Sequence, residues 1–238
     1  VPRMLDETAG VMLQQWCESK GVRVLTSTMI SEVGDGPEGL TVHTKGGEAL
    51  DAKLLVVAAG VQPNIGFLAS SGVTIEHGIL VDQYMRTSVP DVYAAGDVCQ
   101  AIDFSTQKAE MLAIQPVAVE HGRIAAQNMT GKATPHEGSL NMNVLESMGL
   151  ITASFGLWMG VEGGDSAKMV DLPNNRYLRL EFDGNKLVGG QAVGLTEHVG
   201  ILRGLIQTEL DLGPWKDKLM KEPQRLPEAY VAVAQGIV

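Results

Sequence analysis

Periodic apolar residues predict a helix, a strand and a hairpin in the first fifty positions. Between residues 6 and 20, apolar side chains recur at helical spacing, and Gly21 follows as a C-terminal stop. Residues 22–33 alternate and are rich in β-branched side chains, which favours a strand. The runs 39–44 and 49–50 flank a Lys-Gly-Gly-Glu turn, which predicts a β-hairpin because glycine adopts the positive φ of a tight turn.

Two short apolar runs end in small residues and a glycine. The run 52–60 lacks polar alternation, as is typical of a parallel strand buried on both faces. The run 91–97 predicts another strand, which ends at Asp97. Small residues at such strand ends let a ligand approach the backbone, but they equally leave room for a packed helix. Asp97 equally suits a hydrogen bond to a sugar-type hydroxyl or the cap of a following helix.

A helix with an electropositive start is expected after these strands. Apolar periodicity and Pro116, which belongs in a first turn, place the helix over residues 116–128. Free N–H groups at residues 115–118 would suit an anionic or carbonyl-bearing ligand. A short strand is expected at residues 78–82, and residues 131–135 have the composition of a linker.

The last hundred residues have a different organisation. Residues 140–159 mix apolar residues with glycines and predict short strands. The runs 177–182 and 186–194 flank an Asp-Gly-Asn turn and predict a hairpin. Residues 199–208 form an amphipathic helical pattern. This part is expected to be a small α+β unit built on an antiparallel sheet.

Composition and charge narrow the possible functions. The chain has 238 residues, 28 of them glycine, with 45% hydrophobic and 5% aromatic residues, which favours an α/β protein with tight turns. Its net charge of −10 argues against nucleic acid and anionic membranes as partners, because both need a basic face. The longest strongly apolar run, residues 54–61, is the length of a strand and far too short for a membrane span.

Metal and disulfide chemistry have no support in the sequence. Cys17 and Cys99 are far apart and form no CxxC motif, so two free thiols and a reducing cytoplasm are expected. Without any ligand cluster, a metal-dependent hydrolase is disfavoured. No metal-binding spacing connects the five histidines, which are His43, His77, His121, His136 and His198. The chain has no signal-peptide pattern and opens as if inside a domain.

Residues 87–97 carry the most specific motif. Their sequence, Thr-Ser-Val-Pro-Asp-Val-Tyr-Ala-Ala-Gly-Asp, fills every fixed position of T-S-x-P-x-[VI]-[YF]-A-x-G-D. This pattern is the second flavin-binding motif of the FAD-dependent pyridine nucleotide-disulfide oxidoreductases, which the chain therefore resembles. Residues 54–64 resemble the family's A-T-G-x-x-P-N strand end, with Ala59 in place of threonine. Residues 115–118 and 122–123 resemble the following helix, whose N-terminus lies under the flavin.

The resemblance implies an α/β fold class, with partial doubly wound NAD(P)- and FAD-binding sheets followed by a small α+β C-terminal domain. Residues 1–63 resemble the C-terminal part of the NAD(P)-binding domain, and residues 64–132 the second segment of the FAD-binding domain. Residues 133–238 resemble the interface domain of the NADH-oxidase, ferredoxin-reductase and nitrite-reductase branches. The chain lacks the two G-x-G-x-x-G motifs that hold the cofactors' pyrophosphates in the family. It therefore resembles a carboxyl-terminal half, and a fragment, a cleaved product or a split subunit is expected.

The implied cofactors are FAD and NAD(P)H. By resemblance, Asp97 would accept a hydrogen bond from a ribityl hydroxyl of FAD, and Gly96 would let the backbone approach. The N–H groups near Gln115, Pro116 and Val117 would face the N1–C2=O edge of the flavin, where partial positive charge stabilises the reduced flavin anion.

The resemblance also places the nicotinamide nucleotide and the thiols. Ala59 and Gly60 would line the path of NAD(P)H. Cys99, two residues after Asp97, is expected to be a packing residue. Cys17 is expected to pack beside Leu13, because a reactive thiol needs a nearby positive charge or a helix N-terminus.

Two functions from different classes remain open. The first is a FAD-dependent NAD(P)H oxidoreductase that moves a hydride from NAD(P)H to FAD and then to an unknown electron acceptor, either a small molecule or a redox protein. The alternative is a non-catalytic fragment or split subunit that assembles with a chain carrying the glycine-rich motifs. In this second case the chain alone would be inactive and colourless.

Apolar residues in the third domain favour a homodimer or a hetero-oligomer. Phe155, Leu157, Trp158 and Met159 are more than a unit of this size needs for its own core. The alternative is that they pack against residues 64–132.

Overall fold

The computed structural model describes residues 4–37, 39–195, 197 and 199–236. Its contacts divide the chain into two units. One unit consists of residues 17–62, and the other of Val1–Trp16 together with Pro63–Val238. Helix α1 (Glu7–Ser19), predicted by the sequence, begins in the larger unit and ends in the smaller one.

The smaller unit is built on a three-stranded antiparallel sheet in the order β1-β2-β3. The predicted hairpin is confirmed, with Leu40 opposite Ala52 and Val42 opposite Leu50. The strand predicted at 22–33 begins only at Ile30 and pairs with β2. The strand bounds are β1 Ile30–Gly36, β2 Gly39–Thr44 and β3 Ala49–Ala52.

The strand predicted over residues 52–60 is wrong for this structure. Strand β3 ends at Ala52, and the residues that follow have no regular secondary structure. Leu54, Val56 and Val57 are each about three-quarters exposed (76%, 75% and 77%). A strand buried on both faces needs neighbouring strands and covering helices. Within the described residues no strand pairs with residues 53–60.

The first part of the larger unit holds a short sheet in the order β4-β5-β6, packed against α2. Strands β4 and β5 are parallel, and β5 and β6 are antiparallel. The strand predicted at 91–97 is wrong, because Tyr93 forms only an isolated bridge with Arg86 and the regular strand begins at Cys99. The bounds are η1 Gly66–Leu68, β4 Ile79–Leu80, η2 Gly96–Val98, β5 Cys99–Ile102, β6 Ala109–Glu110 and α2 Gln115–Met129.

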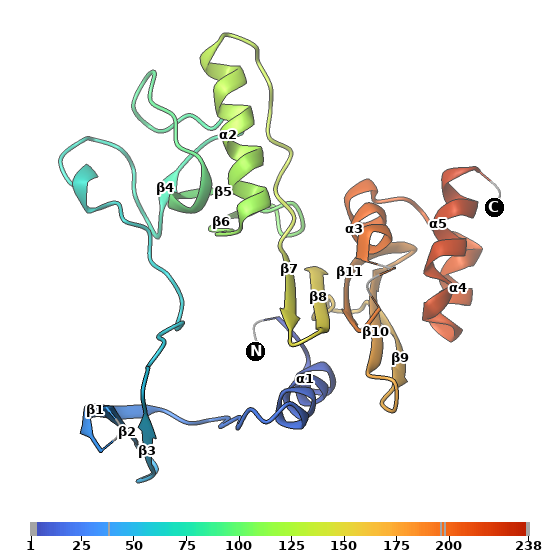
Figure 1. Cartoon of the computed structure of the whole chain (residues 1–238). Helices are drawn as coiled ribbons and strands as arrows, with labels where there is room; N and C mark the ends of the chain where they lie inside the picture. Colours follow the sequence, from blue (N-terminus) through green and yellow to red (C-terminus); the bar gives the residue numbers. More distant parts are fainter. Residues whose placement is uncertain (1–3, 38, 196, 198, 237–238) are drawn as a thin grey trace. The chain divides into compact units, whose positions relative to one another are not determined.

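The last part is the expected α+β unit. Its antiparallel sheet has the order β7-β8-β11-β10-β9, and α3, α4 and α5 lie along it (Figure 1). Leu178, Leu180 and Phe182 of β10 are fully buried in a core that includes Leu202 of α3 and Leu219 of α4. The bounds are β7 Met142–Ser147, β8 Leu150–Gly156, β9 Asp165–Asp171, β10 Arg176–Asp183, β11 Lys186–Val193, α3 Val199–Thr208, α4 Pro214–Lys221, η4 Pro223–Arg225 and α5 Leu226–Ala234.

The opposite face of β10 is polar and receives the start of α1. Asp6, which accepts a hydrogen bond from the Ala9 N–H, also accepts one from the Tyr177 hydroxyl at 2.5 Å and one from Arg179 at 3.0 Å. Arg179 in turn pairs with Glu181. Burial alone would raise the pKa of Asp6, but the hydrogen bonds from Ala9, Tyr177 and Arg179 outweigh it and lower the pKa.

The mixed α/β class predicted from the sequence is confirmed. Parallel pairing between strands, the mark of a doubly wound sheet, is limited among the described residues to β4 and β5. In the described part of the chain, no helix is both long enough and apolar enough to span a bilayer.

Candidate functional site

The turn at Gly96 packs directly against the first turns of α2. Gly96 has a φ of +80°, which favours glycine, and a Cβ built on it would lie 3.4 Å from the Cβ of Ala118. A Cβ at position 96 would therefore lie at ordinary van der Waals distance from α2, which shows how near the turn is to the helix. The structure thus brings together two predicted flavin-contact elements, the 96–97 turn and the start of α2.

The first turn of α2 is uncapped. Ile114 stands at the N-cap in extended conformation and supplies no side-chain hydrogen bond, and Pro116 occupies the first turn as predicted. Gln115 and Pro116 are exposed, whereas Val117 is buried against the rest of the unit. A helix start without a capping side chain has backbone donors available for a ligand.

Asp97 has an exposed side chain inside η2. The N-cap of that short helix is Ala95, so Asp97 does not cap it. In the part of the chain that the structure describes, the Asp97 carboxylate forms no hydrogen bond or ion pair. Its oxygens are therefore available to accept hydrogen bonds from a bound hydroxyl group.

Ala59 and Gly60 belong to the smaller unit, whereas the residues above belong to the larger one. Both are exposed, and Gly60 has a φ of +108°, where an added Cβ would meet no atom within 4 Å. The predicted role of these two residues in the NAD(P)H path stays a prediction.

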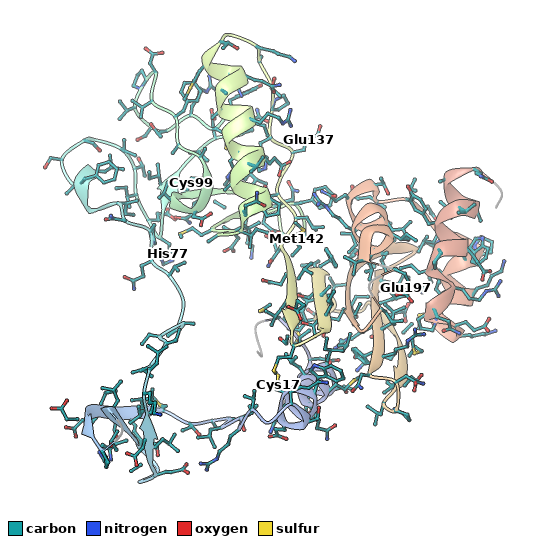
Figure 2. The ribbon with its side chains drawn as sticks, viewed as in Figure 1. Cys17, His77, Cys99, Glu137, Met142 and Glu197 are labelled. Atoms are coloured by element: carbon teal, nitrogen blue, oxygen red, sulfur yellow. The ribbon has the colours of Figure 1, made fainter. Side chains whose placement is uncertain are left out.

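A chain of buried polar side chains lies behind the 96–97 turn, and sequence reasoning missed it. Cys99 Sγ lies 3.3 Å from His121 Nδ1, and His121 Nε2 lies 3.1 Å from the hydroxyl of Ser139. The same hydroxyl lies 2.9 Å from His136 Nε2 and donates to Glu120 Oε2 at 3.0 Å. Cys99, beside α2 in Figure 2, is one of the two free cysteines that the sequence predicted.

Burial governs the protonation of this cluster. It lowers the pKa of His121 to about 4, with a further lowering by His136, and it raises the pKa of Cys99 to about 11. Burial also lowers the pKa of His136, against the opposing effect of Glu120. At neutral pH both imidazoles are therefore neutral and Cys99 is a thiol, which agrees with its predicted packing role.

The sequence held one usable signal for this cluster. His121 stands four residues after Val117 and four before Ala125, so helical periodicity places it on the buried face of α2. A polar residue at a core position needs hydrogen-bond partners. Ser139 and His136, from the segment after α2, had no such marker.

A cavity of about 270 Å³ runs along α2 from Pro116 to Arg123. Its far side is formed by Met142 of β7 and Arg203 of α3, and Glu120 also lines it. Met142 is labelled at the start of β7 in Figure 2. The cavity thus begins beside the uncapped helix start.

The model of the pyridine nucleotide-disulphide oxidoreductase family matches residues 1–122. The chain belongs to this family. The matched range includes the 96–97 turn and the start of α2. Members of the family bind FAD and NAD(P)H.

Similar proteins share both sequence and fold with the chain. The NAD(P)H nitrite reductase of Bacillus subtilis is 30% identical over 88% of this chain and 26% of its own length. The epsilon subunit of the NADH-dependent phenylglyoxylate dehydrogenase of Aromatoleum evansii is 31% identical over 92% of this chain and 52% of its own length. The NAD-dependent persulfide reductase of A. fulgidus is 26% identical, with a TM-score of 0.78 over 89% of this chain and 43% of its own. The chain therefore spans about half the length of these relatives, or less.

The residues present fit the flavin of this family. An uncapped helix start offers backbone donors to the carbonyl edge of a flavin, and a glycine at positive φ removes a side chain where a backbone approaches a ligand. For metals, the described residues contain no group of three or more histidine, cysteine, aspartate or glutamate side chains that could hold an ion. His198 lies outside the described residues.

Proposed function

We propose that this chain supplies the flavin-edge and C-terminal parts of a FAD-dependent NAD(P)H oxidoreductase. When bound, the flavin accepts a hydride from NAD(P)H and passes the electrons to an acceptor. The chain's own residues bind and orient the cofactor, since the flavin carries the redox chemistry and the protein provides position and electrostatics.

One observation carries this proposal: the 96–97 turn lies beside the uncapped start of α2, where a Cβ built on Gly96 would be 3.4 Å from the Cβ of Ala118. The turn presents a free carboxylate on Asp97, and the helix presents backbone donors near Gln115 and Val117. A cofactor with hydroxyl groups on one part and a carbonyl edge on another matches these two sets of groups. FAD has both, in its ribityl chain and its flavin ring.

The helix start also tunes the cofactor. The aligned peptide dipoles of α2, a helix of 15 residues, put partial positive charge at its N-terminus. Negative charge that develops at the flavin N1–C2=O edge is stabilised there, because the donors are already in place and need no reorganisation. Ala59 and Gly60 are proposed to line the NAD(P)H path on the basis of the family resemblance.

A second candidate function is that of a subunit which works only with a partner chain. The exposed apolar run over residues 54–61 favours it, because Leu54, Val57 and Val61 are about three-quarters or more exposed. A chain that carries the glycine-rich motifs would cover this run. One relative in Aromatoleum evansii is itself named as an enzyme subunit.

The acceptor and the oligomeric state belong to the same proposal. The electron acceptor is a small molecule or a redox protein. The protein itself is a homodimer or part of a hetero-oligomer. Of the four apolar residues that suggested an interface, Phe155 lies in the core of the α+β unit and Leu157 and Trp158 are half-buried. Met159 is 62% exposed and is the one available to a partner.

Flavin absorbance tests the function directly. The full-length product of the gene that encodes this chain is expected to be yellow as purified, to contain one FAD per polypeptide, and to be bleached by NADH or NADPH under anaerobic conditions. A colourless product that takes up no added FAD would contradict the oxidoreductase proposal. If colour appears only after a second gene product is added, the subunit proposal holds.

A further inference from the structure

The buried polar chain behind the 96–97 turn connects this turn to α2 and to the segment that follows it. Cys99 begins β5, directly after η2, and its sulfur lies 3.2 Å from the carbonyl oxygen of Gly96. The same sulfur lies 3.3 Å from Nδ1 of His121 on α2. The thiol is therefore within hydrogen-bond distance of both the 96–97 turn and the second turn of α2.

The hydrogen-bonding capacity of these buried side chains determines which atoms carry the protons. The Ser139 hydroxyl has one proton, which it donates to Glu120, and two lone pairs, which face Nε2 of His121 and Nε2 of His136. Both imidazoles must therefore carry their proton on Nε2. It follows that Nδ1 of neutral His121 is an acceptor. The single proton of the Cys99 thiol has two acceptors within reach, the Gly96 carbonyl oxygen and this nitrogen, and the thiol bridges them.

These groups are deeply buried. Cys99, His121, His136 and Ser139 have exposed fractions between 1% and 4%. Buried polar groups cost free energy unless they are paired, and an apolar cluster of the same volume would pack without this cost. Their hydrogen bonds are directional, however. They hold the backbone at Cys99 at a fixed distance from α2 more strictly than apolar contacts would.

We propose that His121 is a positioning residue for the flavin: through Cys99 and Ser139 it sets the separation between the 96–97 turn and the first turn of α2. This inference rests on the proposed function above. If α2 shifted along its axis, the donors at its start would move relative to Asp97, and one rigid cofactor would no longer meet both sets of groups. A change at His121 should therefore alter cofactor affinity and potential without removing any group that contacts the cofactor.

The test uses the full-length gene product and three histidine variants. His121→Leu removes both hydrogen bonds, and His121→Gln keeps a donor that can reach Ser139. His77→Gln is the matched control, because His77 is an exposed histidine in the same part of the unit (Figure 2). For each protein the FAD dissociation constant, the midpoint potential of bound flavin and the thermal unfolding midpoint are measured.

His121→Leu is expected to raise the FAD dissociation constant about tenfold and to shift the flavin potential to more negative values, since the positive helix start is less well placed. His121→Gln is expected to show a smaller change, and His77→Gln none. The double variant His121→Leu/Ser139→Ala should bind FAD no more weakly than the worse single variant, because both substitutions break the same series of hydrogen bonds.

A second pair keeps the inference testable if His121→Leu does not fold. Cys99→Ser retains a donor to Nδ1 of His121, whereas Cys99→Ala removes it. Only Cys99→Ala is expected to weaken FAD binding and shift the potential, and rescue by serine would show that the hydrogen bond matters.

Three results would overturn the inference. Unchanged FAD affinity and potential in His121→Leu, with only a lower unfolding temperature, would show a purely structural role. An equal shift in His77→Gln would show a general effect of removing a histidine. A parent protein that binds no FAD would remove the proposed function itself, and this outcome is distinguishable because no variant is needed to see it.

Discussion

The tripeptide Ala-Ala-Gly occurs twice in this chain, at residues 58–60 and at residues 94–96, and the two copies have opposite environments. The second copy is packed: Ala94 lies in a core with Met85 and Ile124, and a Cβ built on Gly96 would lie 3.4 Å from the Cβ of Ala118. The first copy is exposed, and a Cβ on Gly60 would meet nothing. An apolar run predicts burial only where covering elements are present, and α2 covers the second copy.

The largest effect expected from this difference is on turnover. The 238-residue chain, mixed with NADH, added FAD and a dye acceptor, should show no oxidation above the free-flavin background. Hydride transfer needs both cofactors held, and each pyrophosphate site requires a glycine-rich turn at a helix start that this chain lacks. Turnover clearly above that background would place the cofactor sites elsewhere.

The next effect is on folding stability. Ala94→Asp should lower the free energy of unfolding by about 3 kcal/mol or more, because it buries an unpaired carboxylate. Val57→Asp, at a position 77% exposed, should change it by less than about 0.5 kcal/mol. Urea unfolding of both variants decides this, and equal losses would show that the first copy is also buried in solution.

Acid should lower the folding stability of the unit that contains the second copy, through His121. The folded state takes up a proton on His121 only near pH 4, whereas an unperturbed histidine does so near 6.5. The unfolded chain thus binds more protons in this window, so stability is complete above about pH 6.5 and falls as the pH drops toward 4. The loss from His121 is at most about 3 kcal/mol. Unfolding free energies measured from pH 7 to pH 4 should decline, and the decline should be smaller in His121→Gln.

Replacing Asp97, which directly follows the second Ala-Ala-Gly copy, should weaken FAD binding more than it lowers the free energy of unfolding. In the full-length gene product, Asp97→Ala should weaken FAD binding by about 1.5–3 kcal/mol, the usual contribution of a charged hydrogen bond. Its unfolding free energy should change by less than about 0.5 kcal/mol, because the side chain is exposed. Titration and urea unfolding of the same samples separate the two, and unchanged affinity would remove Asp97 from the site.

The smallest effect compares the two glycines directly. Gly60→Ala and Gly96→Ala both place a side chain at positive φ, which costs about 1–2 kcal/mol. Only Gly96→Ala also places its new Cβ against Ala118 of α2, so only this variant should reduce FAD affinity in the full-length product. Similar affinities for the two variants would show that the contact with α2 does not matter for the cofactor.

Sequence patterns predicted local structure well and long-range contacts poorly. The helix over residues 199–208 and the turn at residues 183–185 follow from nearby residues alone, and both are present. The motif at residues 87–97 resembles a flavin-binding motif of the family. Its residues are largely irregular, because the regular strand pairing starts only at Cys99. Ser139 could not be linked to Cys99 from the sequence, because forty residues separate them and no periodicity spans that distance.

Strand β10 has two faces with different mutational consequences. On its apolar face, Leu178 and Leu180 can each be replaced singly by an aliphatic residue of similar volume, because apolar contacts have no directional partner to lose. On its polar face, Arg179 pairs with both Asp6 and Glu181, so replacing Arg179 leaves the buried Glu181 carboxylate without its counter-charge. Divergent descendants of this protein should therefore change these three positions together, as correlated substitutions that connect the first residues of the chain with its last domain.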